Sequence, residues 1–241
     1  MAYRVADTFQ RWVRDPEIMT TVVAVLRPWA SVLPGLGPDF ACALRLRALA
    51  LSVEYRYGDA LIDVEEALRI CRRAPIVRRT TTEVQIARAL SLRAYLLRCV
   101  GREREAVDDA REALALCRER LSRAPHRFGP GLLSSLDELA RSLDGTGEPG
   151  QALPFGEELV DILRRLAPRR PRYERFLASA LHQLGGYISD AGDLTDALRV
   201  ANESLQLYRR LGREQPEAFA LQAELATHNR DLFLDRLNQQ G

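Results

Sequence analysis

The strongest constraint on this chain is a sequence pattern that recurs four times, at spacings of 45 or 46 residues. Each copy begins with apolar and small residues at intervals of three and four, the pattern of one face of an α-helix. The anchor leucines are Leu44, Leu90, Leu136 and Leu181, and the small residues four positions later are Ala48, Ala94, Ala140 and Gly185. Self-similarity at such a period indicates an array of helical repeats.

Each copy is expected to be a helical hairpin. The turn positions are Tyr55, Gly101, Gly147 and Gly192, and the first small residues of the second helices are Ala60, Ala106, Ala152 and Ala197. Glycine ends a helix readily because it adopts a positive φ without steric cost. Small residues along one stripe let a neighbouring helix approach closely. The pattern therefore predicts paired antiparallel helices.

The signature Leu-x-x-x-[Ala/Gly]-x-x-[Leu/Ile]-x-x-x-Gly-x-x-x-x-Ala resembles the core of the tetratricopeptide repeat family over roughly residues 41–211. The period exceeds the family's usual length of about 34 residues, which implies a long-repeat variant. The resemblance implies an all-α, right-handed superhelical solenoid of about four antiparallel helix pairs, with capping helices at both ends.

The predicted organisation has an N-terminal capping region, four repeats and a C-terminal capping helix. Their limits are 1–37 for the first cap, about 38–74, 79–124, 126–168 and 172–215 for the repeats, and 216–241 for the last cap. In the first cap, Asp15-Pro16-Glu17 is typical of a helix start. Trp12 and Trp29, the two tryptophans, are expected to be buried against the first repeat.

Composition excludes several classes of protein. The formal net charge is +2, from 35 basic and 33 acidic residues, so we expect no nucleic-acid partner. Every basic residue is arginine, and the missing lysine excludes a P-loop and a pyridoxal Schiff base. Neither a signal peptide nor an apolar stretch long enough to span a bilayer is recognisable, which favours a cytoplasmic protein without a membrane partner.

The sequence contains no recognisable catalytic or metal-binding constellation. His126, His182 and His228 lie in different repeats, and none has a ligand spacing. Gly145, Gly147 and Gly150 spell GxGxxG, but no strand is expected before them, so a helix-end turn is the better interpretation. Cys71 and Cys117 share a repeat position that holds Leu163 and Tyr208 elsewhere, which indicates reduced, buried thiols. We therefore expect no enzyme, cofactor or metal.

Glu66, Glu112, Glu158 and Glu203 also share one repeat position, on the second helix. A catalytic acid would not be repeated in every unit, so these carboxylates are interpreted as solvated charges with arginine partners.

The resemblance also implies a binding surface, because the first helices of such repeats line a concave groove. Carried onto this sequence, the candidate groove residues are Arg45, Arg88, Ser91, Tyr95, Arg98, Asp137, Arg141, His182 and Ser189. Arginines beside a tyrosine can hold carboxylates in a bidentate manner, which favours an acidic or C-terminal peptide. Because arginine is so abundant here, solvent-exposed arginines without a binding role remain the alternative.

Three functions follow from these expectations. The first is a non-enzymatic scaffold that binds a peptide or a partner domain in the groove. The second is a ligand- or peptide-sensing regulatory domain that acts with a transcription factor or a signalling ATPase. The third, an enzyme on a helical scaffold, has no residues to support it. The sequence leaves a homodimer open.

Overall fold

A computed structural model describes residues 15–74 and 79–239, and this part of the chain is almost entirely helical. Its α-helices are α2 (Pro16–Val32), α3 (Gly37–Val53), α4 (Tyr57–Arg73), α5 (Arg79–Cys99), α6 (Glu103–Leu121), α7 (Pro125–Gly145), α8 (Pro149–Leu166), α9 (Glu174–Asp190), α10 (Leu194–Glu214) and α11 (Pro216–Asn238). Short 3₁₀ turns lie at Pro34–Leu36, Ala167–Arg169 and Pro171–Tyr173. These described ranges contain no strand, so the predicted all-α class is confirmed.

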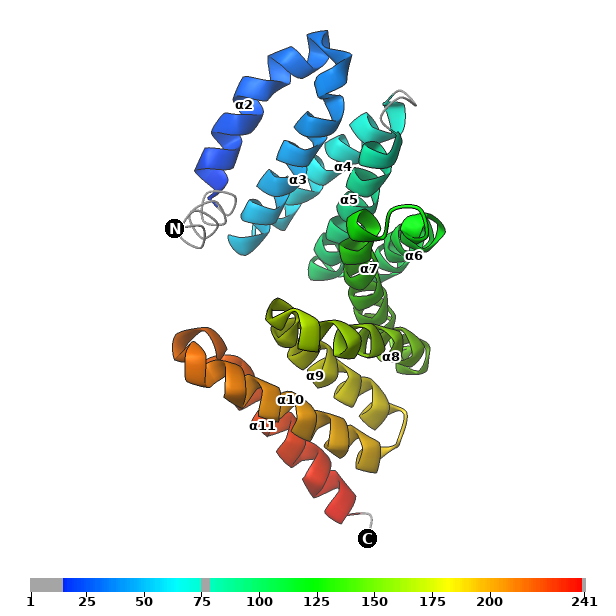
Figure 1. Ribbon diagram of the computed structural model, residues 1–241, viewed down its shortest axis with the longest axis vertical. Helices are drawn as coiled ribbons and strands as arrows, with labels where there is room; N and C mark the ends of the chain where they lie inside the picture. The colour runs from blue at the N-terminus through cyan, green and yellow to red at the C-terminus, as the bar shows by residue number, and fades with distance from the viewer. Residues whose placement is uncertain (1–14, 75–78, 240–241) are drawn as a thin grey trace. The chain divides into compact units, whose positions relative to one another are not determined.

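The chain divides into two compact units, one ending at Ser142 and one beginning at Leu143. In the first unit each helix packs on the next in chain order, from α2 to α6, and α3 also packs on α5 (Figure 1). In the second unit α9 packs on both α8 and α10, and α10 packs on α11. Helix pairs that pack on their sequence neighbours are the arrangement expected of a repeat array. Because the division falls within α7, inside the expected third repeat, the predicted limits of caps and repeats stay a prediction.

The turns that close the hairpins have the predicted backbone. Within residues 15–74 and 79–239, the residues with positive φ are Tyr55 at 60°, Gly101 at 77°, Gly147 at 80° and Gly192 at 98°. In each turn, the amide of the residue after the positive-φ position donates a hydrogen bond to a backbone carbonyl near the end of the first helix. The N···O distances are 3.1 Å for Arg56 to Leu51, 2.9 Å for Arg102 to Leu97, 3.2 Å for Glu148 to Leu143 and 3.2 Å for Asp193 to Ile188. This bond is part of the Schellman motif, which satisfies a carbonyl that the helix end leaves free.

Helix α2 starts at the predicted position, but its tryptophan is not buried as predicted. An Asp15 carboxylate oxygen accepts hydrogen bonds from the amides of Glu17 and Ile18, at 2.9 and 3.2 Å. The prediction that Trp29 is buried is wrong, because 58% of its surface is exposed. Helix α2 packs on α3 through the stripe that contains Met19 and Val23, and Trp29 lies on the adjoining side of the helix. Trp12 lies outside the described residues.

Pro154 is the sixth residue of α8 and lies in the second turn of that helix. Cys71 and Cys117 are buried free thiols, as their shared repeat position predicted. Burial raises the pKa of each thiol to about 11, so both are protonated at neutral pH.

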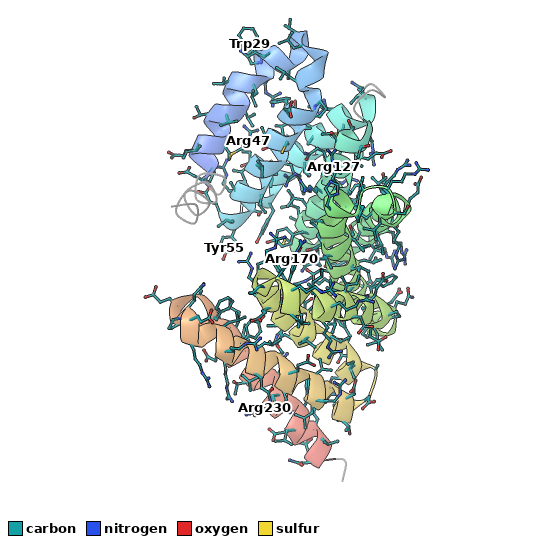
Figure 2. The ribbon with its side chains drawn as sticks, in the orientation of Figure 1. Trp29, Arg47, Tyr55, Arg127, Arg170 and Arg230 are labelled. Carbon is teal, nitrogen blue, oxygen red and sulfur yellow. The ribbon has the colours of Figure 1, made fainter. Side chains whose placement is uncertain are left out.

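A buried ion pair ties the two helices of the first repeat together, and an equivalent pair does so in the second. Arg47, labelled in Figure 2, donates from Nε to Asp63 at 2.6 Å, and Arg93 donates to Asp109 at 2.5 and 2.6 Å. Both aspartates are buried. In the fourth repeat the equivalent positions hold Leu184 and Val200, which are also buried. The same position between paired helices therefore accepts either a matched ion pair or two apolar side chains.

Three of the four repeated glutamates, Glu66, Glu112 and Glu203, have arginine partners, as predicted for this position. Arg27 pairs with Glu66 at 2.7 Å, Arg72 with Glu112 at 2.9 Å, and Arg164 with Glu203 at 2.6 Å. In each pair the arginine lies 39 or 40 residues earlier in the chain, so the bridge joins different helices rather than neighbouring turns of one helix. These bridges link α2 to α4, α4 to α6 and α8 to α10, each to the next helix but one, and each contributes modestly because it is partly exposed.

Replacing Tyr55 by glycine should stabilise the protein. A side chain at a φ of 60° is strained by about 1 kcal/mol, and Tyr55 is 79% exposed, so little packing is lost with it. We expect Tyr55→Gly to raise the free energy of unfolding by about 0.5 kcal/mol after the greater entropy of the unfolded chain is included. Urea denaturation measures the change. Tyr55→Ala is the control, since alanine keeps the strained Cβ, and equal stability of the two variants would contradict the explanation.

A double substitution should rescue the loss of the Arg93–Asp109 pair. Asp109→Val alone leaves the half-buried Arg93 without its partner and should cost about 2 kcal/mol or more. Adding Arg93→Leu reproduces the side chains that the fourth repeat has at these positions, so the double variant should lie within about 1 kcal/mol of the wild type. Thermal and urea denaturation of both single variants and the double variant complete the cycle. Additive losses would show that the two sites are not exchangeable.

Candidate functional site

The candidate site is a pocket of about 420 Å³ within the first unit, where α3, α5 and α7 contribute side chains. Its lining residues are Arg45, Leu49, Arg88, Ser91, Leu92, Tyr95, Pro130, Gly131, Ser134 and Glu138. Four of them, Arg45, Arg88, Ser91 and Tyr95, belong to the groove predicted from the sequence. Helices α3, α5 and α7 are the first helices of three successive repeats, so the repeat spacing brings together residues that are about 46 positions apart in the sequence.

Two arginines give the pocket its positive charge. Neither Arg45 nor Arg88 forms an ion pair within the described part of the chain, and the Nε atom of Arg45 is buried without a hydrogen-bond partner there. Burial and the neighbouring charge of Arg45 both lower the pKa of Arg88. Two adjacent guanidinium groups in a partly buried site are favourable only where an anion neutralises them. The pocket is therefore suited to a carboxylate or another small anion.

Polar and aromatic groups complete the pocket. The buried Ser91 hydroxyl donates to the Ala87 carbonyl at 3.1 Å and lies 3.1 Å from the Ser135 hydroxyl, which links α5 to α7. The Arg98 guanidinium lies over the Tyr95 ring, 5.6 Å from its centre, and fixes one wall. Burial, together with a hydrogen bond to Cys99, raises the pKa of Tyr95 to about 12. The phenol therefore stays protonated and can donate a hydrogen bond.

Sequence reasoning missed Glu138, the carboxylate that lines this pocket. Its side chain is 14% exposed and its Oε2 lies 3.6 Å from Arg98, with no hydrogen-bond partner for that oxygen among the described residues. Burial, and secondarily the charge of Asp137, raises the pKa of Glu138 to about 7. A signal was present, because the equivalent positions in the other repeats hold Leu46, Leu92 and Gln183. An acid at a mostly apolar repeat position marks a local departure from the pattern.

The remaining predicted groove residues do not join the pocket lining. Asp137 and Arg141 pair with each other along α7 at 3.2 Å, where both are about one-third exposed. His182 and Ser189 lie in the second unit, on α9, and both contact α11. His182 Nε2 is 3.4 Å from Asn229 Nδ2, and Ser189 Oγ accepts a hydrogen bond from Arg236 at 2.8 Å. The C-terminal helix thus occupies the polar groups that the prediction assigned to a ligand.

The described chain offers no alternative centre for metal chemistry. Among residues 15–74 and 79–239, no three His, Cys, Asp or Glu side chains come together in a way that could hold a metal ion. In the same ranges, the helices are too short or too polar to cross a membrane.

Comparison with solved structures defines the class of fold. The chain is similar to BtubC (BKLC) from P. vanneervenii with a TM-score of 0.63 and 17% identity, over 94% of this chain and 92% of that one. Two structures of a Podospora anserina putative kinesin light chain with nearly identical TPR-like repeats match with TM-scores of 0.59 and 0.56, each at 20% identity. They cover 82% and 83% of this chain and 87% of their own. The fold is therefore that of an antiparallel helix-pair repeat protein.

A family model for the tetratricopeptide repeat matches residues 86–126 and 177–211. These segments correspond to most of α5 with α6, and to most of α9 with most of α10. The sequence matches no curated protein. The two matched segments are therefore tetratricopeptide-like helix pairs, and the rest of the chain shares their repeat pattern and helix-pair fold.

Glu138 should make the stability of the first unit depend on pH. Its pKa is about 7 when folded and about 4.3 when unfolded, so the folded state binds the extra proton between these values. The resulting stabilisation is complete below about pH 4 and is lost as the pH rises through about 7. Relative to Glu138→Gln, the wild type should therefore lose on the order of 2 kcal/mol between pH 5 and pH 8. Urea denaturation at both values tests this, with the exposed Glu157→Gln as control. A constant difference would contradict it.

Proposed function

We propose that this protein is a non-enzymatic interaction scaffold and that its first unit binds an acidic or C-terminal peptide segment. The observation that carries the proposal is the pair of arginines in the pocket, Arg45 and Arg88, which have no carboxylate partner in the described chain. Other arginines on the same helices are matched to acids, as Arg47 and Arg93 are. Two unmatched guanidinium groups in one pocket support a role in binding rather than in folding.

The pocket offers distinct contacts to the two parts of such a ligand. A carboxylate would receive hydrogen bonds from Arg45 and Arg88, and these charge-assisted bonds are stronger than neutral ones. The Tyr95 ring and the apolar parts of Leu49 and Leu92 would contact the adjoining aliphatic portion. Glu138 disfavours a second acidic group beside it when it is ionised, which restricts where further carboxylates of the ligand can lie.

A ligand-sensing regulatory domain is the second candidate. The volume of about 420 Å³ falls within the usual range of small-molecule sites, so an anionic metabolite is a competing occupant of the same two arginines. Native mass spectrometry of the purified protein distinguishes the two candidates, because a retained small anion favours the sensor and its absence favours the peptide scaffold.

Peptide capture tests the scaffold proposal. Peptides from a digest of native-cell lysate are incubated with immobilised wild type, with Arg45→Gln/Arg88→Gln, and with Arg104→Gln/Arg111→Gln as control. Arg104 and Arg111 are exposed on α6, so the control removes the same charge outside the pocket. We expect acidic peptides to bind wild type and control but to bind the pocket variant about tenfold or more weakly.

Equal helicity and melting of the three proteins exclude unfolding as the cause of a lost interaction. Recovery of the same peptides by the pocket variant would overturn the assignment of the site to Arg45 and Arg88. Blocking the peptide carboxylates by amidation should remove binding to the wild type, and unchanged binding after amidation would overturn the proposed ligand class.

A further inference from the structure

A second pocket in the first unit has a different chemistry. It has a volume of about 480 Å³ and lies where the C-terminal end of α6 meets the first turns of α5 and α7. Its lining residues are Thr80, Glu83, Arg120, Arg123, Ala124, His126, Arg127 and Phe128. It shares no lining residue with the pocket of Arg45 and Arg88, so it is a separate site.

The charges around this second pocket are unbalanced. Glu83 is the carboxylate in its described lining, and it is already paired with Arg120 at 3.0 Å. Arg123 and Arg127 are exposed and form no ion pair within the described residues. Apart from the His126 ring, three arginines against one glutamate leave a net charge of about +2 on the described lining.

The pocket is also held in a defined shape. Arg120 is 13% exposed, its position is fixed by Glu83 of α5, and its Nε is buried without a hydrogen-bond partner in the described chain. Phe128 is buried and packs this end of α7. Arg127, labelled in Figure 2, lies in the first turn of α7 together with His126. Positive charge from the start of α7 adds to that of the side chains.

We propose that this pocket binds a phosphoryl group. Two unmatched arginines call for a ligand with about two negative charges, and a phosphate monoester carries between −1.5 and −2 at neutral pH, roughly matching them. Its three oxygens accept hydrogen bonds from Arg123, Arg127 and His126, and the Thr80 hydroxyl can donate a further one. A carboxylate carries half of this charge and has two oxygens. This inference goes beyond the peptide scaffold and does not depend on it.

The phosphoryl group can come from a phosphorylated peptide or from free phosphate, and an NMR titration at pH 7.5 separates them. The probes are N-acetyl-phosphoserine amide, inorganic phosphate and N-acetyl-glutamate amide. We expect the wild type to bind a phosphorylated probe at least about tenfold more tightly than the glutamate probe. Tighter binding of the phosphoserine probe than of inorganic phosphate indicates a peptide source, and equal binding indicates recognition of the phosphoryl group alone.

Variants locate the binding site. Arg123→Gln/Arg127→Gln should weaken phosphoryl binding by about tenfold or more, because two charge-assisted contacts are lost. Arg104→Gln/Arg111→Gln removes the same charge from α6, and Arg45→Gln/Arg88→Gln empties the other pocket of its arginines, so both should keep the wild-type affinity. All variants are compared at equal helicity and melting temperature.

Two results would overturn the inference. One is a wild type that binds the glutamate probe as tightly as the phosphorylated probes. The other is an equal loss of affinity in the Arg104→Gln/Arg111→Gln control, which would show general attraction to an arginine-rich surface. A wild type that captures no acidic peptide but binds the phosphorylated probes would refute the scaffold proposal and leave this inference standing.

Discussion

The close approach of paired helices is the constraint on which the rest of this structure depends. The first small residues of the second helices, Ala60, Ala106, Ala152 and Ala197, have no exposed surface. At the partner position in the fourth repeat, a Cβ added to Gly185 would lie 3.6 Å from the Ala197 carbonyl oxygen and 3.3 Å from Phe233. Larger side chains at these positions would push the helices apart, and the spacing of every outward-facing residue would change with them.

Arginine serves several purposes in this chain, and its partners distinguish them. Within the first two repeats, Arg47 and Arg93 are matched to buried aspartates and hold helix pairs together. At the surface, other arginines bridge a helix to the next but one through three of the repeated glutamates. Arg45 and Arg88 in one pocket and Arg123 and Arg127 in another lack such partners in the described chain. The number of arginines alone says little about binding. An arginine without a matching acid, in contrast, indicates a position where the negative charge of a ligand would be stabilised.

The candidate site was only partly predictable from the sequence. The repeat register brings Arg45, Ser91 and Tyr95 into the lining of one pocket, because Arg45 and Ser91 each directly follow an anchor leucine and Tyr95 comes one helical turn after Ser91. Glu138 was not expected, since it departs from the repeat at a position usually held by Leu or Gln. His182 and Ser189 obey the same register, yet α11 contacts them through Asn229 and Arg236. Register fixes which residues face one side, but it does not fix which other element covers them.

By itself, the sequence determined the helix pairs, the positive-φ turns that close them and the resemblance of the repeats to tetratricopeptide repeats. These properties depend on residue types at fixed short spacings, and Tyr55 in place of a turn glycine did not alter the conformation. The tertiary structure alone decided that Trp29 is exposed, that Glu138 is buried beside Arg98, and which arginines lack acids. Burial and charge matching depend on side chains tens of residues apart, whose contacts are set by how the helices pack rather than by any local pattern.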